Sequence, residues 1–156
     1  MTASNWLGIE TNASRENMGK YPKLNEQYQT MISKMVDEFT GIGAVVILDL
    51  HWSDDDNGQQ VMPFKAKSGT GGAIEFWESV SAMFKDNDHV FYELYNEPHN
   101  NSTDLFINGN DTYAGMLDMI AAVRKNSADQ MLVIAGANDW AYDAASLIEL
   151  DGKTDD

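Results

Sequence analysis

Short apolar runs rich in β-branched residues alternate with amphipathic segments along this chain, and this alternation restricts the possible folds more than any other feature. The runs cover residues 44–50 (AVVILDL), 90–95 (VFYELY) and 131–135 (MLVIA), at intervals of roughly 40 to 45 residues. Runs that are apolar at successive positions are typical of strands buried on both faces, as in parallel sheets. The sequence therefore predicts an α/β fold built from βαβ units.

The segments around these runs have helical periodicity. The clearest is Asn25 to Phe39, where Asn25 is expected to cap the start and Gly41 or Gly43 to end the helix. One apolar stripe runs along it, formed by Tyr28, Met31, Ile32, Met35, Val36 and Phe39. Further helices are expected at 74–84, after a polar loop at 53–72, and at 113–121, with a weaker one at 144–150.

Two parallel folds fit this alternation, an open doubly wound sheet and a closed barrel. A nucleotide-binding open sheet requires G-x-G-x-x-G after a strand, and none of the three runs is followed by it. His51 and Trp52 follow the first run, Asn-Glu-Pro-His at 96–99 follows the second, and Gly-Ala-Asn-Asp-Trp at 136–140 follows the third. Polar and aromatic residues at the carboxyl ends of the strands favour a barrel enzyme.

The net charge of −15 excludes several kinds of partner. Nucleic acids and anionic lipids both require a basic surface, so neither a nucleic-acid nor a membrane partner is expected. A neutral polysaccharide meets no such repulsion, although the charge is also explained by solubility alone. No apolar run reaches the roughly 18 residues that a membrane helix requires.

The sequence predicts no cofactor and no metal. The acidic run at 54–56, followed by Asn57 and Gly58, does not have the ligand spacing of an EF-hand. Three histidines and no cysteine do not make a zinc cluster, and the absence of cysteine also excludes disulfides.

The motifs at the strand ends resemble those of glycoside hydrolase family 5 cellulases. VILDLHW (46–52) is similar to the third barrel strand of that family, VFYELYNEPH (90–99) to the fourth, and LVIAGANDW (132–140) to the fifth. SNWLG (4–8) resembles the loop that leaves the second strand. The resemblance implies a partial (β/α)8 TIM barrel with three parallel strands and flanking helices, so that residues 1–156 form one incomplete catalytic barrel domain.

The resemblance also implies an activity, the retaining hydrolysis of internal β-1,4-glucosidic bonds in a β-glucan polysaccharide. This reaction requires an acid that protonates the leaving oxygen and a second carboxylate as nucleophile. The glutamate of the family's Asn-Glu-Pro motif is the general acid/base, which corresponds to Glu97. Asn96 would bind the 2-hydroxyl of the sugar beside the cleaved bond, and His51 would bind the same sugar.

Three further side chains are candidate sugar-binding residues. Trp52 and Trp140 are expected to stack on sugar rings, although tryptophan is also common in protein cores. His99 is expected either to face the sugar or to cap its loop. His89, alone before a strand, is interpreted as structural.

Strand alternation adds an expectation about two acidic residues. Asp49 shares a face with His51, and Glu93 shares one with Tyr95 and Glu97, because side chains alternate along a strand. If His51 and Glu97 point to the barrel mouth, Asp49 and Glu93 point into the barrel. Buried carboxylates require partners, and these are expected to lie outside the chain.

The chain also departs from the family pattern. Family members carry the nucleophilic glutamate on the seventh strand, whereas the only glutamate after Trp140 is Glu149, within an apolar helical pattern. The fragment is therefore expected to be inactive alone. Alternatives are a β-mannan or β-1,3-glucan hydrolase, or a non-catalytic sugar-binding remnant. The family implies a secreted protein, although residues 1–9 do not have the pattern of a signal peptide.

Overall fold

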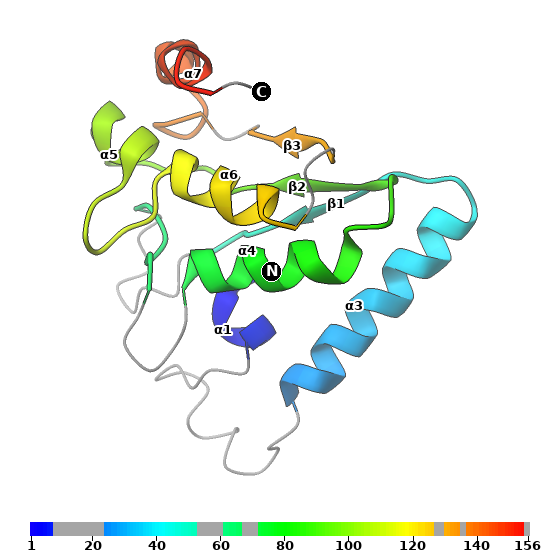
Figure 1. The fold of residues 1–156 in the computed structure, drawn as a ribbon. Helices are drawn as coiled ribbons and strands as arrows, with labels where there is room; N and C mark the ends of the chain where they lie inside the picture. The colour runs from blue at the N-terminus through cyan, green and yellow to red at the C-terminus, as the bar shows by residue number, and fades with distance from the viewer. Residues whose placement is uncertain (8–23, 53–60, 67–71, 127–129, 135–136, 155–156) are drawn as a thin grey trace.

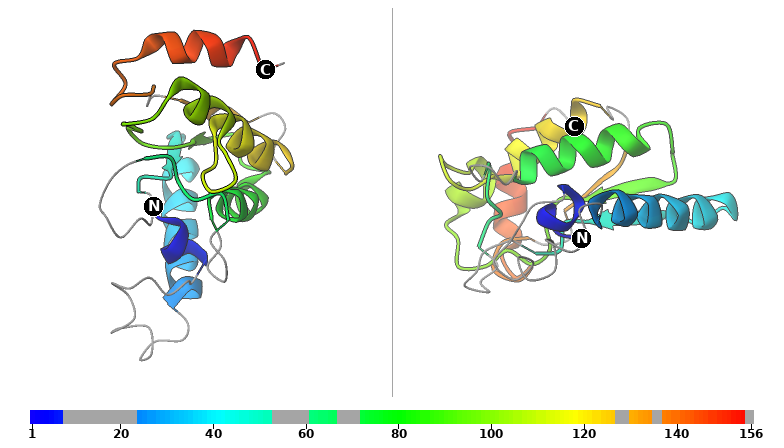
Figure 2. Two further views of the ribbon diagram at one scale, coloured as in Figure 1. Left: turned by 90° about the vertical axis from the view of Figure 1, so that its left-hand side faces the viewer. Right: turned by 90° about the horizontal axis from the view of Figure 1, so that it is seen from below.

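The computed structural model describes residues 1–7, 24–52, 61–66, 72–126, 130–134 and 137–154. The helices and strands within these ranges follow the order α1 (Ala3–Leu7), α3 (Leu24–Gly41), β1 (Val46–Asp49), α4 (Ala73–Phe84), β2 (Val90–Glu93), α5 (Thr103–Asn108), α6 (Met116–Arg124), β3 (Leu132–Val133) and α7 (Ala144–Asp151). The strands lie side by side behind α4 and α6 (Figure 1). Helices α3 and α7 lie on opposite sides of the molecule (Figure 2).

The three strands form a parallel sheet in the order β1-β2-β3. Val46 pairs with Val90, and Tyr92 pairs with Leu132. The predicted strands, their order and their parallel direction are therefore confirmed, although each observed strand is shorter than its apolar run. Thr2 forms an isolated parallel bridge to Trp52. This bridge lies three residues after the end of β1.

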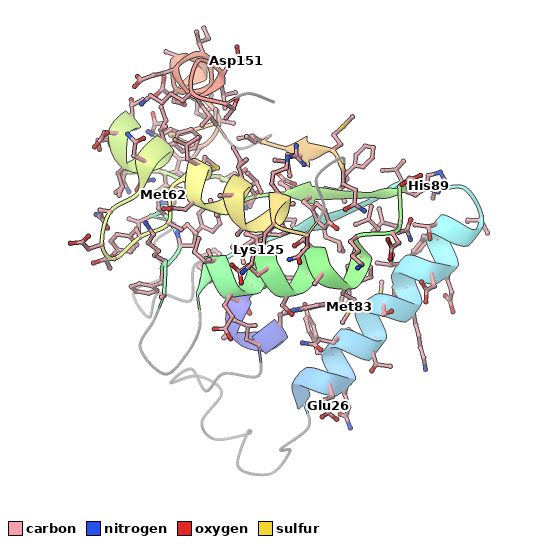
Figure 3. All side chains as sticks on the ribbon, in the orientation of Figure 1. Glu26, Met62, Met83, His89, Lys125 and Asp151 are labelled. Carbon is pink, nitrogen blue, oxygen red and sulfur yellow. The ribbon has the colours of Figure 1, made fainter. Side chains whose placement is uncertain are left out.

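Helices α4 and α6 pack against each other and cover one face of the sheet. Their apolar side chains fill the core together with Leu48 and Tyr92 of the strands (Figure 3). The indole of Trp77 is fully buried and donates a hydrogen bond to the carbonyl of Leu94 at 3.2 Å. Ile47 and Met131, which alternation places on the opposite face, are each about half exposed. That face therefore has little cover from the described residues.

One buried amide joins the ends of two helices to the sheet. The Gln130 side chain donates to the carbonyls of Phe84 at 2.7 Å and Asn87 at 2.9 Å. Its oxygen accepts a hydrogen bond from the Tyr92 hydroxyl at 3.1 Å. The Arg124 guanidinium donates to the Gln130 carbonyl at 2.7 Å. A buried amide is stable when its donors and acceptor are satisfied, and these bonds hold the segment just before β3 against the ends of α4 and α6.

The four expected helices are all present, and their observed starting points lie within three residues of the expected ones. Helix α3 contains Asn25, so Asn25 is not its N-cap, whereas the end is as expected: Gly41 is the last helical residue and Gly43 follows with φ 84°. Helix α6 begins at Met116 rather than at residue 113, because the Asp118 carboxylate accepts a hydrogen bond from the Gly115 N–H at 3.1 Å. Helix α5 was not expected, and α1 replaces part of the expected loop at 4–8.

The apolar stripe of α3 is only partly buried. Val36 is buried, whereas Met31, Met35 and Phe39 are each about half exposed. Helix α3 contacts α1 and β1 through the buried side of the stripe. The periodicity predicted the helix correctly but did not predict how much of the stripe finds cover in this chain.

Candidate functional site at the carboxyl edge of the sheet

The predicted site residues follow the strands at one edge of the sheet, because the carboxyl ends of parallel strands lie together. His51 and Trp52 follow β1, and residues 96–99 follow β2. Trp140 lies in the loop between β3 and α7. His89, by contrast, directly precedes β2 and lies at the other end of the sheet (Figure 3).

Backbone hydrogen bonds hold the loop after β2 against its neighbours on both sides. The N–H of Asn96 donates to the Leu50 carbonyl at 3.2 Å, which ties the loop to the end of β1. The Pro98 carbonyl accepts from the N–H of Trp140 at 3.2 Å, which ties it to the loop after β3. Glu97 lies between these two anchors with its side chain exposed.

Glu97 has a φ of 43°, in the left-handed region that non-glycine residues rarely adopt. Strand β2 ends at Glu93, so strand alternation does not extend to Glu97. Tyr95, expected on the same face, is fully buried and donates its hydroxyl proton to the Val61 carbonyl at 3.0 Å. The expectation that Glu93, Tyr95 and Glu97 share a face therefore stays a prediction beyond the end of the strand. Left-handed residues held by their surroundings are frequent at functional sites.

His99 and Trp140 are in direct contact. Their rings are stacked with centroids 4.2 Å apart and planes at 9°. His99 Nδ1 also lies 3.1 Å from the Glu97 carbonyl, and because a carbonyl only accepts, Nδ1 carries the proton. Of the two expected roles of His99, the geometry therefore supports the loop cap. One face of the Trp140 indole is covered, and 45% of the residue remains exposed.

The loop that carries Trp140 has an unusual backbone. Asp139, Trp140 and Ala141 have φ values of 57°, 54° and 68°, which makes three successive left-handed residues. The Ala141 N–H donates to the Ala137 carbonyl at 2.9 Å and closes this left-handed turn. Such residues are individually strained, so tertiary contacts must hold the turn in place.

Asn138 supplies one of these contacts and was not singled out in the sequence. Its side chain is buried and donates to the Asn101 carbonyl at 2.9 Å, which links the loops after β2 and β3 a second time. The Asn138 side-chain oxygen is buried and has no hydrogen-bond partner among the described residues. The signal in the sequence that could have identified Asn138 is its position between small residues and Trp140, in the loop after a strand.

A second cluster lies on the sheet face that α4 and α6 do not cover. Asp49 and Glu93 are register partners on β1 and β2, and Nδ1 of His51 lies 2.6 Å from Oδ2 of Asp49. The expectation that the partner of Asp49 lies outside the chain is therefore wrong for Oδ2, whereas Oδ1 is buried and has no hydrogen-bond partner among the described residues. Burial and, secondly, the charge of Asp49 raise the pKa of Glu93, whereas His51 acts in the opposite direction.

Trp52 is exposed and pairs with Thr2 through its backbone. It is not a core residue of this chain, and its indole is accessible at the carboxyl edge of the sheet. The acidic run at 54–56 lies outside the described residues. Among those that are described, no group of three potential ligands is arranged to hold a metal ion. No described helix is long and apolar enough to cross a membrane.

A segment of parallel barrel whose carboxyl edge carries an exposed glutamate, imidazoles and indoles has the organisation of a barrel enzyme. The chain belongs to the cellulase family, glycosyl hydrolase family 5, whose family model matches residues 5–154. It is 28% identical over 117 residues to the probable endo-beta-1,4-glucanase B of Neosartorya fischeri, an alignment that covers 75% of this chain and 32% of that protein.

Solved structures show the same fold. XacCel5A in complex with cellopentaose matches with a TM-score of 0.58 at 22% identity, over 74% of this chain and 34% of that one. Cel5A (EG2) from Hypocrea jecorina (Trichoderma reesei) matches 99% of this chain and 48% of that one, with a TM-score of 0.59 and 16% identity. The chain therefore has part of a (β/α)8 barrel and spans about a third of the length of the curated relative above.

Proposed function

We propose that this chain carries the acid/base part of the active site of a retaining endo-β-1,4-glucanase, with Glu97 as general acid/base. The observation that carries the proposal is the placement of Glu97: exposed, left-handed in its backbone, and held between Asn96 and Pro98, which are bonded to the two neighbouring loops. A proton donor that acts on a glycosidic oxygen requires this combination of access and fixed position. Family membership and relatives named endo-β-1,4-glucanases support the glucanase activity in this proposal.

In the proposed reaction, Glu97 protonates the oxygen of the leaving sugar as the bond to the anomeric carbon breaks. A nucleophilic carboxylate about 5 Å away forms the glycosyl intermediate, and Glu97 then removes a proton from the attacking water. Glu149 does not suit the nucleophile role, because it lies on α7 and pairs with Lys153 at 3.3 Å. We propose that the nucleophile comes from a part of the family barrel that this chain does not span.

The other predicted residues bind the substrate in this proposal. Asn96 and His51 offer an amide and an imidazole to sugar hydroxyls. Trp52 and the open face of Trp140 offer apolar rings to the C–H faces of sugars, and His99 supports Trp140 from its other side. A polymeric β-glucan does not cross a cell membrane, so the proposed substrate implies that the enzyme acts outside the cell.

Two proteins test the proposal, the chain alone and the chain joined to further barrel strands. The chain alone is expected to give no hydrolysis of cellopentaose above buffer, because the oxocarbenium-like transition state lacks its second carboxylate. Joined to the remaining barrel strands of a related cellulase, it is expected to hydrolyse cellopentaose with retention. Glu97→Gln in the joined protein should lower kcat/KM about 10²- to 10⁴-fold, and less for aryl glycosides whose leaving groups need no protonation.

The matched control is Glu149→Gln, which removes a carboxylate from α7 and should leave the rate unchanged. A joined protein that binds cellopentaose but never turns it over would favour the non-catalytic sugar-binding alternative. Equal activity of the wild type and Glu97→Gln would sink the assignment of Glu97. Comparison of β-1,4-glucan, β-mannan and β-1,3-glucan as substrates decides among the hydrolase alternatives.

A further inference from the structure

The pairing of Asp49 with His51 has a defined geometry at the end of β1. The two side chains are two residues apart and lie on the same side of the chain, with Nδ1 of His51 2.6 Å from Oδ2 of Asp49. The Asp49 side chain is 23% exposed and the His51 side chain 62% exposed. The carboxylate therefore contacts Nδ1 of a ring whose side chain is mostly exposed.

This contact determines which nitrogen of the neutral imidazole carries the proton. An ionised carboxylate only accepts hydrogen bonds, so Nδ1 must donate. In a neutral ring with Nδ1 protonated, Nε2 has a lone pair and accepts a hydrogen bond. The distance of 2.6 Å is short for an N–H···O bond, as expected when the acceptor is charged.

Two further groups lie beside Asp49, whose second oxygen, Oδ1, is buried and has no hydrogen-bond partner among the described residues. Glu93 on β2 is its register partner, and the amino group of Met1 donates to the backbone carbonyl of Asp49 at 2.6 Å. Because the pKa of Glu93 is raised, this carboxyl keeps its proton to a higher pH than an ordinary glutamate.

We propose that Asp49 is a positioning residue that fixes the Nδ1–H tautomer of His51 and so makes Nε2 an acceptor for a substrate hydroxyl. The tautomer itself depends only on the contact between Asp49 and His51. The identity of the hydroxyl donor as a β-glucan rests on the proposed function above. Without Asp49, an Nε2–H tautomer would present a donor where the sugar offers its proton, and the hydrogen bond would be lost.

The first test measures the tautomer in the intact 156-residue chain. At about pH 8.5, two units above the ordinary histidine pKa, ¹⁵N NMR of the ring nitrogens separates the Nδ1–H and Nε2–H forms. His99, which donates from Nδ1 to a carbonyl, is an internal reference for the Nδ1–H form, and exposed His89 is a reference for an exposed ring. His51 is expected to match His99.

Asp49→Ala removes the acceptor, and the His51 signals should then move to the pattern of His89. If that variant does not fold, Asp49→Asn keeps the shape, and its amide should raise the Nε2–H fraction above that of the wild type. Asp88→Asn is the matched control, because it removes an exposed carboxylate beside His89. An Nε2–H form of His51 in the wild type, or an unchanged His51 in both Asp49 variants, overturns the proposal.

The second test measures cellopentaose binding from chemical-shift changes. The Asp49→Ala variant should lose one hydrogen bond to the sugar, so its affinity for cellopentaose should be about tenfold lower than that of the wild type. The affinity of the Asp88→Asn variant should be unchanged. If the tautomer changes and the affinity does not, the role of Asp49 in presenting His51 to substrate is wrong. If the wild type has the expected tautomer but binds no cellopentaose, the proposed function fails while the effect of Asp49 on His51 stands.

Discussion

The imidazole of His99 lies flat against the indole of Trp140, at a centroid separation of 4.2 Å. Since His99 follows β2 and Trp140 precedes α7, this contact joins the loops at the ends of neighbouring strands. The backbone N–H of Trp140 reinforces this contact by donating a hydrogen bond to the Pro98 carbonyl. The stacked pair thus holds the loop of Glu97 and an exposed aromatic surface in a fixed relation.

Trp140→Ala should therefore loosen the loop as well as remove an aromatic surface. We expect the free energy of unfolding to fall by about 1 kcal/mol, as for other aromatic pairs. Amide exchange at Ala141 should become faster, because its N–H closes the turn. Tyr142→Ala is the control, since Tyr142 is 85% exposed in the same loop. Equal effects of the two substitutions on exchange would contradict a specific role for the stack.

Ala141→Gly should stabilise the protein. Ala141 has a φ of 68°, where a side chain costs about 1 kcal/mol or more relative to glycine. Part of that gain is offset by the greater freedom of glycine in the unfolded chain. The same substitution at Ala145, exposed in α7, should destabilise by about 1 kcal/mol. Urea unfolding of both variants measures the expected difference in sign.

The sequence was sufficient for the sheet but not for the loops. Three β-branched runs predicted β1, β2 and β3 in their correct order, because a buried parallel strand requires apolar residues on both faces. The stack of His99 on Trp140 depends on a left-handed turn at Asp139, Trp140 and Ala141. None of these residues is a glycine, so the residue types did not predict the turn. The exposure of Met35 depends on which elements pack against α3. The periodicity of the helix itself does not predict these neighbours.

The buried amide of Gln130 should be important for stability. Gln130→Met keeps a similar volume but leaves the carbonyls of Phe84 and Asn87 without its two N–H donors. Each carbonyl keeps one backbone hydrogen bond, from Asn87 N–H and Val90 N–H respectively. The variant therefore loses three buried hydrogen bonds of about 1 kcal/mol each, counting the one from the Tyr92 hydroxyl, so we expect a loss of about 2–3 kcal/mol in the free energy of unfolding. Gln27→Met, at an exposed position of α3, should change it by less than about 0.5 kcal/mol.

The isolated chain should self-associate when salt screens its charge. Ile47, Met131 and Phe39 leave apolar surface exposed, whereas the net charge of −15 opposes contact between copies. Sedimentation velocity at about 0.05 M and 1 M salt should show larger species at high salt, where the Debye length falls to about 3 Å. Ile47→Thr should reduce this association more than Ile148→Thr on α7. A single monomeric species at both salt concentrations would contradict the expectation.

Glu93 should make the stability of the protein depend on pH. Burial, and next the charge of Asp49, raise its pKa above the ordinary value of 4.5 in the folded state. The folded protein then binds this proton more tightly than the unfolded chain does. The resulting stabilisation is complete below pH 4.5 and is lost as the pH rises through the folded-state pKa.

Glu93→Gln should remove this loss, so the stability of the variant relative to the wild type should increase with pH across that window and then level off. Glu38→Gln, at an exposed position of α3, removes the same charge and reports what net charge alone contributes. Urea unfolding at a series of pH values measures both differences. Asp49→Asn should lower the Glu93 pKa only part of the way toward 4.5 in an NMR titration, because burial is the larger cause. A complete return to 4.5 would mean that the neighbouring charge, and not burial, controls this carboxyl group.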